Sequence, residues 1–217
     1  MTAATATELS HYLKTAHSQA KALDRLKIAY RPYICPFDDL LKLVRPGEKI
    51  FDVGCGSGQF ALLLARYANP GWIGGAEINP ELVRNAEELF ANAAIAIDHE
   101  FLVFDGKTFP KSVDSADKVF LIDVFHHVPR LEQKNFLLAL HAAMRPGAVL
   151  VLKDIDAASP LVYFNKLHDL LFSSEIGHEL SAGQLSSLAC DAGFKPLSNS
   201  FRRMLWYPHF TLVLGRT

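Results

Sequence analysis

The sequence predicts an α/β fold organised around an open, mostly parallel sheet. From residue 49 to residue 153, short apolar runs typical of buried strands alternate with segments of helical periodicity. This alternation implies parallel strands joined by right-handed crossovers. A glycine-rich turn at 54–58 follows the first strand-like run, and two strand-like runs near the C-terminus indicate an antiparallel hairpin.

The segment ahead of this body is predicted to be helical. Apolar residues recur at helical spacing from Leu9 to Tyr30, and the opposite face is mostly basic. Pro32 and Pro36 follow, and we expect the two prolines to interrupt the helix because proline lacks the N–H that a helix interior needs. The predicted division is an N-terminal helical lid at 1–39 and an α/β domain at 40–217.

The elements of the body are expected in the following order. A short helix at 38–44 precedes strands at 49–53, 72–77, 100–104, 117–122 and 148–153, with helices between them at 60–67, 80–92 and 130–144. A further helix is expected over 161–172. Ser181 and Gln184 form a capping box that opens another helix, which Gly193 closes. Hairpin strands at 195–206 and 210–214, separated by Tyr207-Pro208-His209, complete the chain.

Composition bounds the function classes. Half of the 217 residues are hydrophobic, so the chain can bury a sizeable core, and a formal net charge of −1 leaves no large basic face for nucleic acid. Three widely spaced cysteines show no metal-ligand spacing and favour a reducing compartment. Residues 1–10 lack a signal-peptide pattern, and no apolar run approaches membrane-spanning length. We therefore expect a cytoplasmic protein with no metal and no membrane partner.

The glycine-rich turn carries the strongest functional signal. Its pattern is Asp52-x-Gly54-x-Gly56-x-Gly58, and Gln59 stands where a dinucleotide-binding turn needs its third glycine. A bulky side chain there would obstruct close helix–strand packing, which argues against an NAD-dependent oxidoreductase. The pattern resembles motif I of the class I S-adenosylmethionine (SAM)-dependent methyltransferases.

The resemblance implies a fold and a cofactor site. The fold would be Rossmann-like, with a seven-stranded sheet of order 3-2-1-4-5-7-6 and strand 7 antiparallel. The turn would pack against the methionine part of SAM, with the motif acid directed toward its amino group. The residues so implied are Asp52, Gly54, Gly56, Ser57 and Gly58.

Further cofactor positions are expected where later strands end. Glu77 closes the second strand, where α/β nucleotide folds place a carboxylate that accepts hydrogen bonds from ribose hydroxyls, and Ile78 follows it. Asp105 and Gly106 end the third strand, where family members often bind the adenine amine; the alternative is an Asp-Gly turn. Asp123, at the end of the fourth strand, resembles the position beside the sulfonium and acceptor.

Two adjacent histidines, His126 and His127, are candidates for a catalytic base. Histidine can take a proton near neutral pH, but a packing or hydrogen-bonding role is the open alternative. The segment also differs from the Asn/Asp-Pro-Pro-aromatic signature of amino-methylating DNA enzymes, because Asp123 is followed by Val124-Phe125-His126. A nucleic-acid substrate is therefore not expected.

Residues that line the substrate pocket are expected from the helical segment and the later strand ends, although each aromatic could equally be a core or lid residue. The candidates are Tyr30, Tyr33, Phe37, Lys153, Tyr163, His168, Trp206, Tyr207 and His209. The stretch from Arg31 to Phe37 also resembles methyltransferases of bacterial aryl-polyene and polyketide-type gene clusters. That resemblance implies an aromatic or acyl-chain acceptor, with an acyl carrier protein as a partner.

The sequence thus predicts a SAM-dependent methyltransferase acting on a small molecule. The methylated atom stays open between oxygen, carbon and nitrogen. A SAM-binding module without turnover, acting as a partner subunit, is the alternative.

Overall fold

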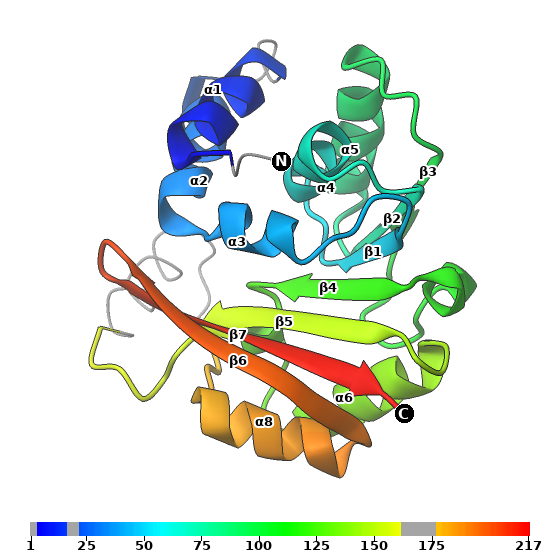
Figure 1. Ribbon diagram of the computed structural model, residues 1–217, viewed down its shortest axis with the longest axis vertical. Coiled ribbons are helices and arrows are strands. Elements are labelled where there is room, and N and C mark those ends of the chain that lie inside the picture. The colour runs from blue at the N-terminus through cyan, green and yellow to red at the C-terminus, as the bar shows by residue number, and fades with distance from the viewer. Residues whose placement is uncertain (1–3, 17–21, 162–176) are drawn as a thin grey trace. The chain divides into compact units, whose positions relative to one another are not determined.

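The structure is a computed structural model that describes residues 4–16, 22–161 and 177–217. The chain divides into two compact units, Met1–Phe104 and Asp105–Thr217 (Figure 1). The helix expected over 161–172 falls on residues of which all but the first lie outside the described part. The division predicted at 39/40 stays a prediction. Among the described residues, no helix has both the length and the apolar character needed to cross a bilayer.

In its described residues, the first unit joins five helices to three parallel strands. Its elements are α1 (Ala6–Ala16), α2 (Ala22–Ile34), α3 (Phe37–Lys42), β1 (Lys49–Val53), α4 (Gln59–Tyr67), β2 (Trp72–Glu77), α5 (Pro80–Asn92) and β3 (His99–Val103). β2 pairs in parallel with β1 on one side and with β3 on the other. Asn79 caps α5 through its side chain, which accepts from the N–H of Glu81 at 2.9 Å, as its position before Pro80 indicates.

The N-terminal helices are packed onto the rest of this unit. Leu9 and Leu13 of α1 are buried, and the Ser10 hydroxyl donates to the Ala29 carbonyl of α2 at 2.7 Å. Tyr12 meets Tyr67 of α4 edge to face at 5.9 Å. α3 continues the contact, since Phe37 stacks on Phe60 of α4 at 5.5 Å.

The expectation that both prolines interrupt the predicted N-terminal helix is wrong for Pro32. α2 continues through it to Ile34. Pro32 lies in the last turn, so its missing N–H removes one bond close to the helix end rather than from the middle. The next turn still closes, because the Cys35 N–H donates to the Arg31 carbonyl at 2.9 Å. Pro36 does end the helical run and stands at the N-cap of α3.

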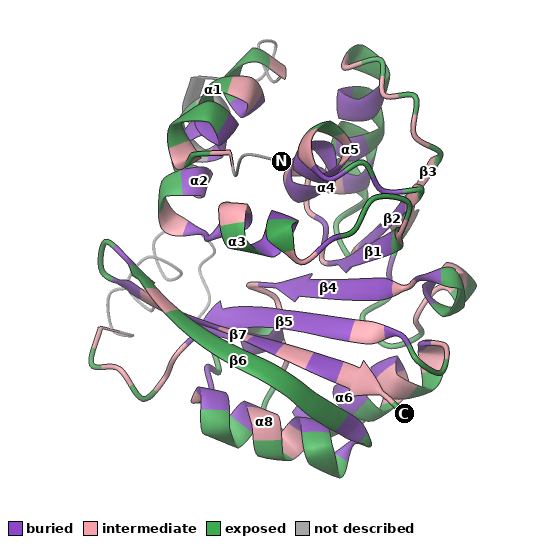
Figure 2. Ribbon diagram, in the orientation of Figure 1, coloured by how far each residue is buried: buried purple, intermediate pink, exposed green. Residues whose placement is uncertain are grey.

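The second unit joins the remaining strands to two longer helices and two 3₁₀ turns. Its described elements are η1 (Lys111–Ser115), β4 (Lys118–Ile122), η2 (Phe125–His127), α6 (Gln133–Ala143), β5 (Val149–Ile155), α8 (Ala182–Asp191), β6 (Phe194–Met204) and β7 (Tyr207–Arg216). β4 and β5 are parallel, whereas β7 runs antiparallel to both β5 and β6. β4 and β5 are buried along almost their whole length, whereas β6 is exposed (Figure 2).

The sheet has seven strands in the order β3-β2-β1-β4-β5-β7-β6. This order and the antiparallel β7 confirm the fold that the resemblance to class I methyltransferases implies.

The hairpin turn was predicted at the wrong residues. β6 and β7 are joined by Leu205 and Trp206, with Met204 paired to Tyr207, so Tyr207, Pro208 and His209 belong to β7. Pro208 is accommodated because β5 ends at Ile155, opposite His209, and the missing N–H falls at the end of that ladder. The turn instead requires Leu205 to adopt the left-handed conformation, at φ 54°.

Candidate cofactor and catalytic site

The glycine turn after β1 is held in a backbone conformation that requires glycine. Gly54, Gly56 and Gly58 have φ values of 77°, 54° and 76°, and α4 begins directly behind Gly58. A Cβ on Gly58 would lie 3.0 Å from the Ala86 side chain, so this glycine permits close packing on α5. A Cβ on Gly56 would meet nothing within 4 Å. The turn therefore presents open space at Gly56, where a ligand can approach the backbone.

Glu77 connects the end of β2 to this turn. Its Oε2 accepts from the Gly56 N–H and its Oε1 from the Asn79 N–H, both at 3.1 Å. Each carboxylate oxygen can accept a further hydrogen bond. Glu77 therefore shapes the glycine turn and keeps capacity for the hydroxyls of a ribose. Ile78, the next residue, is exposed, and Ser57 in the turn is half-buried.

Asp52 is the buried acid of the turn. Its side chain is 3 % exposed, and its Oδ1 has no hydrogen-bond partner. Burial, followed by the nearby Glu77 carboxylate, raises the pKa of Asp52 to about 8, although the positive charge of Arg31 of α2 opposes the shift. An orphaned buried carboxyl fits a ligand that brings a cationic donor, as the amino group of SAM does. The residues of the turn therefore fit this cofactor.

Asp105 forms an Asp-Gly turn, which the sequence analysis considered as the alternative to an adenine-binding role. Its Oδ1 accepts from the N–H groups of Lys107 at 2.8 Å and Thr108 at 2.6 Å, and these bonds lower the pKa of its carboxyl. Gly106 follows with φ 79°. Asp105 is exposed. Its role toward adenine stays a prediction.

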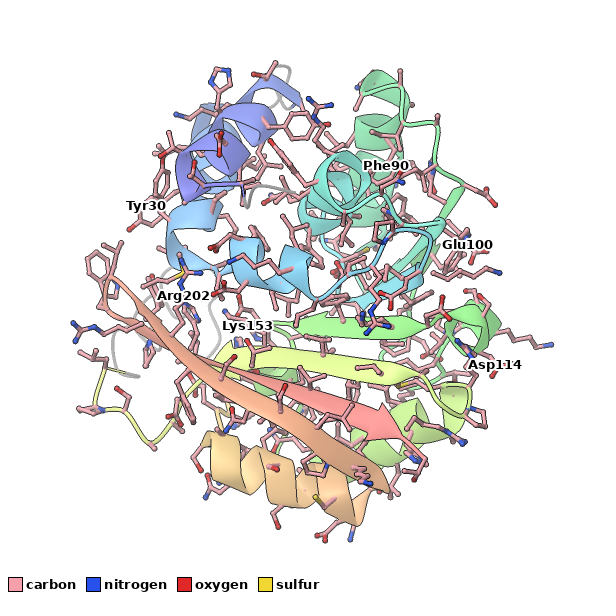
Figure 3. The ribbon with its side chains drawn as sticks, in the orientation of Figure 1. Tyr30, Phe90, Glu100, Asp114, Lys153 and Arg202 are labelled. Carbon is pink, nitrogen blue, oxygen red and sulfur yellow. The ribbon has the colours of Figure 1, made fainter. Side chains whose placement is uncertain are left out.

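In the second unit, the structure brings together two residues that were predicted separately. The Lys153 ammonium donates to Asp123 Oδ1 at 2.5 Å, and the Asp123 N–H donates to the Lys153 carbonyl at 2.9 Å. Lys153, near the end of β5 (Figure 3), is 0 % exposed, and a buried ammonium needs a carboxylate partner. Asp123 has a left-handed φ of 54°, a strained conformation of the kind that recurs at functional sites.

The two adjacent histidines, His126 and His127, differ in how far they are buried. His126 is 4 % exposed, and its Nδ1 lies 2.6 Å from Asp154 Oδ1, while its backbone N–H donates to Asp154 Oδ2 at 3.1 Å. The His126 carbonyl accepts from the His178 N–H at 2.7 Å. His127 is exposed, with its ring centroid 4.1 Å from that of His126. His126 thus connects η2 to β5.

The predicted substrate residues fall into three groups. Tyr207 is buried and stacks on His209 at 6.1 Å. Tyr30 and Tyr33 are partly exposed residues of α2 in the first unit (Figure 3 labels Tyr30). Tyr163 and His168 lie outside the described residues. Within the part of the chain that the structure describes, no group of three or more His, Cys, Asp or Glu side chains could hold a metal ion.

Sequence reasoning missed two functional candidates. Arg31 was not expected to act on the glycine turn, yet its positive charge lowers the pKa of Asp52 against the effect of burial. Asp154 was not singled out, yet it binds His126. The available signal for Asp154 was an acid at the end of a buried strand, where open α/β sheets place ligand-binding residues.

The comparison with known proteins defines the family. The family model described as "Methyltransferase domain" matches residues 12–199. The chain therefore belongs to the class I SAM-dependent methyltransferase family, and the cofactor of that family is the predicted one, S-adenosylmethionine.

Individual relatives are more distant. The chain is similar to methyltransferase GfsG of Streptomyces halstedii (29 % identity, covering 52 % of this chain and 39 % of that protein). It is also similar to 27-O-demethylrifamycin SV methyltransferase of Amycolatopsis mediterranei (28 % identity, 51 % and 40 %). The chain thus spans about two fifths of the length of these relatives. Among solved structures, the [4+2]-cyclase SpnF has the same fold, with a TM-score of 0.67 at 15 % identity over 99 % of this chain and 97 % of that one.

Proposed function

We propose that this chain transfers a methyl group from S-adenosylmethionine to a small-molecule acceptor. The observation that carries the proposal is the first-unit site itself. This site combines a buried Asp52 whose Oδ1 has no hydrogen-bond partner, a glycine turn that is open at Gly56, and a Glu77 carboxylate that accepts from the Gly56 N–H. Family membership assigns the cofactor class that this arrangement fits.

The cofactor, when bound, supplies a sulfonium-activated methyl group that needs little further activation. The chain's own residues therefore have to bind the cofactor and the acceptor, orient them toward each other and exclude water. Glu77 is suited to accept from ribose hydroxyls, because two backbone N–H groups already fix its carboxylate. Asp52 is suited to the amino group, for which it offers an acceptor without a partner.

The second unit supplies the candidates for the acceptor side. The Lys153–Asp123 pair and Tyr207 offer charge and an aromatic surface among buried residues. In neutral His126, a proton on Nδ1 directed at Asp154 leaves Nε2 as the basic nitrogen. We propose His126 as a base for acceptors that must lose a proton. Tyr30 and Tyr33 are proposed to contact the acceptor from the N-terminal segment.

The acceptor is proposed to be an aromatic or carrier-bound biosynthetic intermediate. The resemblance of the Arg31–Phe37 stretch supports this class, and one relative is named as a methyltransferase of the small molecule 27-O-demethylrifamycin SV. An acyl carrier protein is then the proposed partner. We place the reaction in the cytoplasm, a proposal supported by the three cysteines, none of which forms a disulfide.

A second candidate function is SAM binding without methyl transfer. The similar structure of the [4+2]-cyclase SpnF favours keeping this alternative, because that protein has the same fold and is named for a different activity. Radiolabelled methyl transfer to aromatic and carrier-bound acceptors decides between the two. Label in the acceptor supports the methyltransferase, and tight cofactor binding without label in any of them supports the alternative.

The cofactor assignment is tested by calorimetric titration with S-adenosylhomocysteine and with NAD. We expect the former to bind and NAD to give no response. Glu77→Ala should weaken S-adenosylhomocysteine binding about ten- to a hundred-fold, because charge-assisted hydrogen bonds contribute roughly 1.5–3 kcal/mol. Glu88→Ala, which removes an exposed carboxylate of α5, is the matched control. Saturable NAD binding without a response to S-adenosylhomocysteine contradicts the assignment.

A further inference from the structure

Gly177 and His178 pack against the η2 turn that carries His126. The His178 N–H donates to the His126 carbonyl at 2.7 Å, and the His178 carbonyl accepts from Gln133 Nε2 at 3.0 Å. Gln133, the first residue of α6, is 2 % exposed, and the same nitrogen donates to the Val128 carbonyl at 3.3 Å, directly after η2. Both N–H groups of this buried amide therefore hold position 178 beside the turn.

Gly177 lies between the His126 ring and Glu179. A Cβ at position 177 would stand 2.9 Å from His126 Cδ2 and 3.1 Å from the carboxyl carbon of Glu179. Carbon atoms in favourable contact lie about 3.5–4.0 Å apart, so a side chain at 177 would have to displace one of these groups. Both groups are buried, at 4 % and 7 % exposure. Glycine at 177 is therefore what allows the chain to approach the ring this closely.

The opposite edge of the ring is fixed by Asp154. His126 Nδ1 lies 2.6 Å from Asp154 Oδ1, an oxygen that also accepts from the Ile155 N–H at 2.8 Å. Asp154 Oδ2 accepts from the His126 N–H at 3.1 Å. The imidazole is thus confined between Asp154 at Nδ1 and Gly177 at Cδ2. Neither contact uses Nε2, the nitrogen that the proposed function assigns as basic.

We propose that Gly177 and His178 are positioning residues for His126, which hold its ring on Asp154 and direct Nε2 at the acceptor. This inference rests on the proposed function, in which His126 takes a proton from acceptors that must lose one. Gly177 acts by lacking a side chain, and His178 acts through its backbone N–H, since its own side chain is exposed. Such positioning matters because a misplacement of about 1 Å can cost about a hundred-fold in rate.

The first test observes the ring directly and needs no acceptor. The Nδ1 proton of His126, in a short bond to a carboxylate, should give a far-downfield proton NMR resonance in the ligand-free protein, and His126→Gln assigns this resonance by removing it. We expect Gly177→Ala to shift or abolish the resonance. Gly183→Ala is the matched control and should leave it unchanged, because a Cβ at Gly183 meets nothing within 4 Å.

The second test measures radiolabelled methyl transfer to a phenolic acceptor, whose hydroxyl must lose its proton. Gly177→Ala should lower kcat about ten- to a hundred-fold and leave the KM for S-adenosylmethionine unchanged. Gln133→Met removes both donors of the buried amide and should change the resonance and kcat in the same direction. His178→Ala keeps the backbone N–H and should behave like the unmodified protein.

A double variant separates positioning from a merely structural role. Because Gly177 acts through His126, Gly177→Ala should cause no further loss of rate in a His126→Gln protein. A loss that adds to that of His126→Gln, or an unchanged resonance in Gly177→Ala, overturns the proposal. If Gly177→Ala fails to fold, Gln133→Met provides the same comparison. If no acceptor takes up label from the unmodified protein, the proposed function fails, and the NMR comparison still decides whether Gly177 holds the ring.

Discussion

Asp52 makes the stability of the ligand-free protein depend on pH. Its folded-state pKa of about 8 lies well above the ordinary 3.8. Between these values the folded protein holds a proton that the unfolded chain has released. Stability from this group is therefore fullest at low pH and is lost as pH rises from about 4 to 8.

Asp52→Asn should consequently stabilise the ligand-free protein at pH 8. The gain is bounded by roughly 6 kcal/mol, the free energy of a pKa shift of this size, and it should vanish near pH 4. Urea unfolding at pH 4.5, 6.5 and 8 measures the difference between the two proteins. A difference that does not change with pH would show that Asp52 is ionised in the folded state throughout.

At the scale of single residues, the sequence predicted the glycine turn but not its electrostatics. Gly54, Gly56 and Gly58 could be predicted because a strand, a glycine turn and a helix are adjacent in the chain. The bond from Gly56 to Glu77 spans 21 residues, and that from His126 to Asp154 spans 28. Such contacts depend on which strand ends meet, and local pattern does not contain that information.

His126 connects the η2 turn to β5 through Asp154. We therefore expect it to stabilise the fold, whether or not it also acts in catalysis. Leaving a buried carboxylate without its hydrogen-bond donor typically costs about 1–3 kcal/mol or more, and glutamine can replace only part of the bonding to Asp154. We expect His126→Gln to lower the free energy of unfolding by about 1–3 kcal/mol. His127→Gln, on the exposed neighbour, should change it by less than about 0.5 kcal/mol.

Denaturant unfolding of both variants, together with methyl transfer rates, separates structure from catalysis. We expect less than a roughly ten-fold loss of rate for His127→Gln, because alignment of the acceptor provides most of the acceleration. A folded His126→Gln protein with unchanged stability and a hundred-fold lower rate would make His126 a base without an anchoring role.

The β6–β7 turn contains a residue in an unfavourable conformation. Leu205 has φ 54° and a side chain that is 53 % exposed, and the left-handed region costs an ordinary residue roughly 1–2 kcal/mol. Leu205→Asn should stabilise the protein by about 0.5–1 kcal/mol, since asparagine tolerates this region. Thermal unfolding of the variant and the unmodified protein measures this gain in stability. Leu131→Asn, which replaces another exposed leucine, is the control and should show no gain. A loss of stability at 205 would reveal that the leucine side chain contributes a contact of its own.

Element boundaries were predicted well where a local hydrogen bond sets them. In the capping box at α8, the Gln184 N–H donates to Ser181 Oγ at 3.3 Å, and the Ser181 N–H donates to Gln184 Oε1 at 3.0 Å. The hairpin and Pro32 were predicted wrongly because proline was taken as a break in both. Tertiary packing allows proline near the end of a helix or a ladder, where one lost bond is tolerated.

At the scale of the whole molecule, strand order came from resemblance. Alternating periodicity predicts a parallel sheet, but it does not rank the strands, and the reversed β7 is not visible in its apolar pattern. The order β3-β2-β1-β4-β5-β7-β6 was obtained because Asp52-x-Gly54-x-Gly56-x-Gly58 identified a family whose members share one topology. A short motif thus carried more topological information than the remaining sequence.

The N-terminal segment at 1–39, predicted as a lid, is best tested through its response to ligand. α1 is already held by buried leucines, by Ser10 on Ala29 and by Tyr12 on Tyr67. Its amides should therefore exchange slowly with or without S-adenosylhomocysteine.

The last turn of α2 carries Arg31, and the Cys35 N–H donates to the Arg31 carbonyl. If this end of the segment closes on the ligand, amides around 31–37 should become more protected when S-adenosylhomocysteine is added. Hydrogen exchange measured by mass spectrometry resolves the two helices. Ligand-dependent protection of all of α1 would instead show a lid that closes as one body, and unchanged exchange in both helices would show a permanently docked structure.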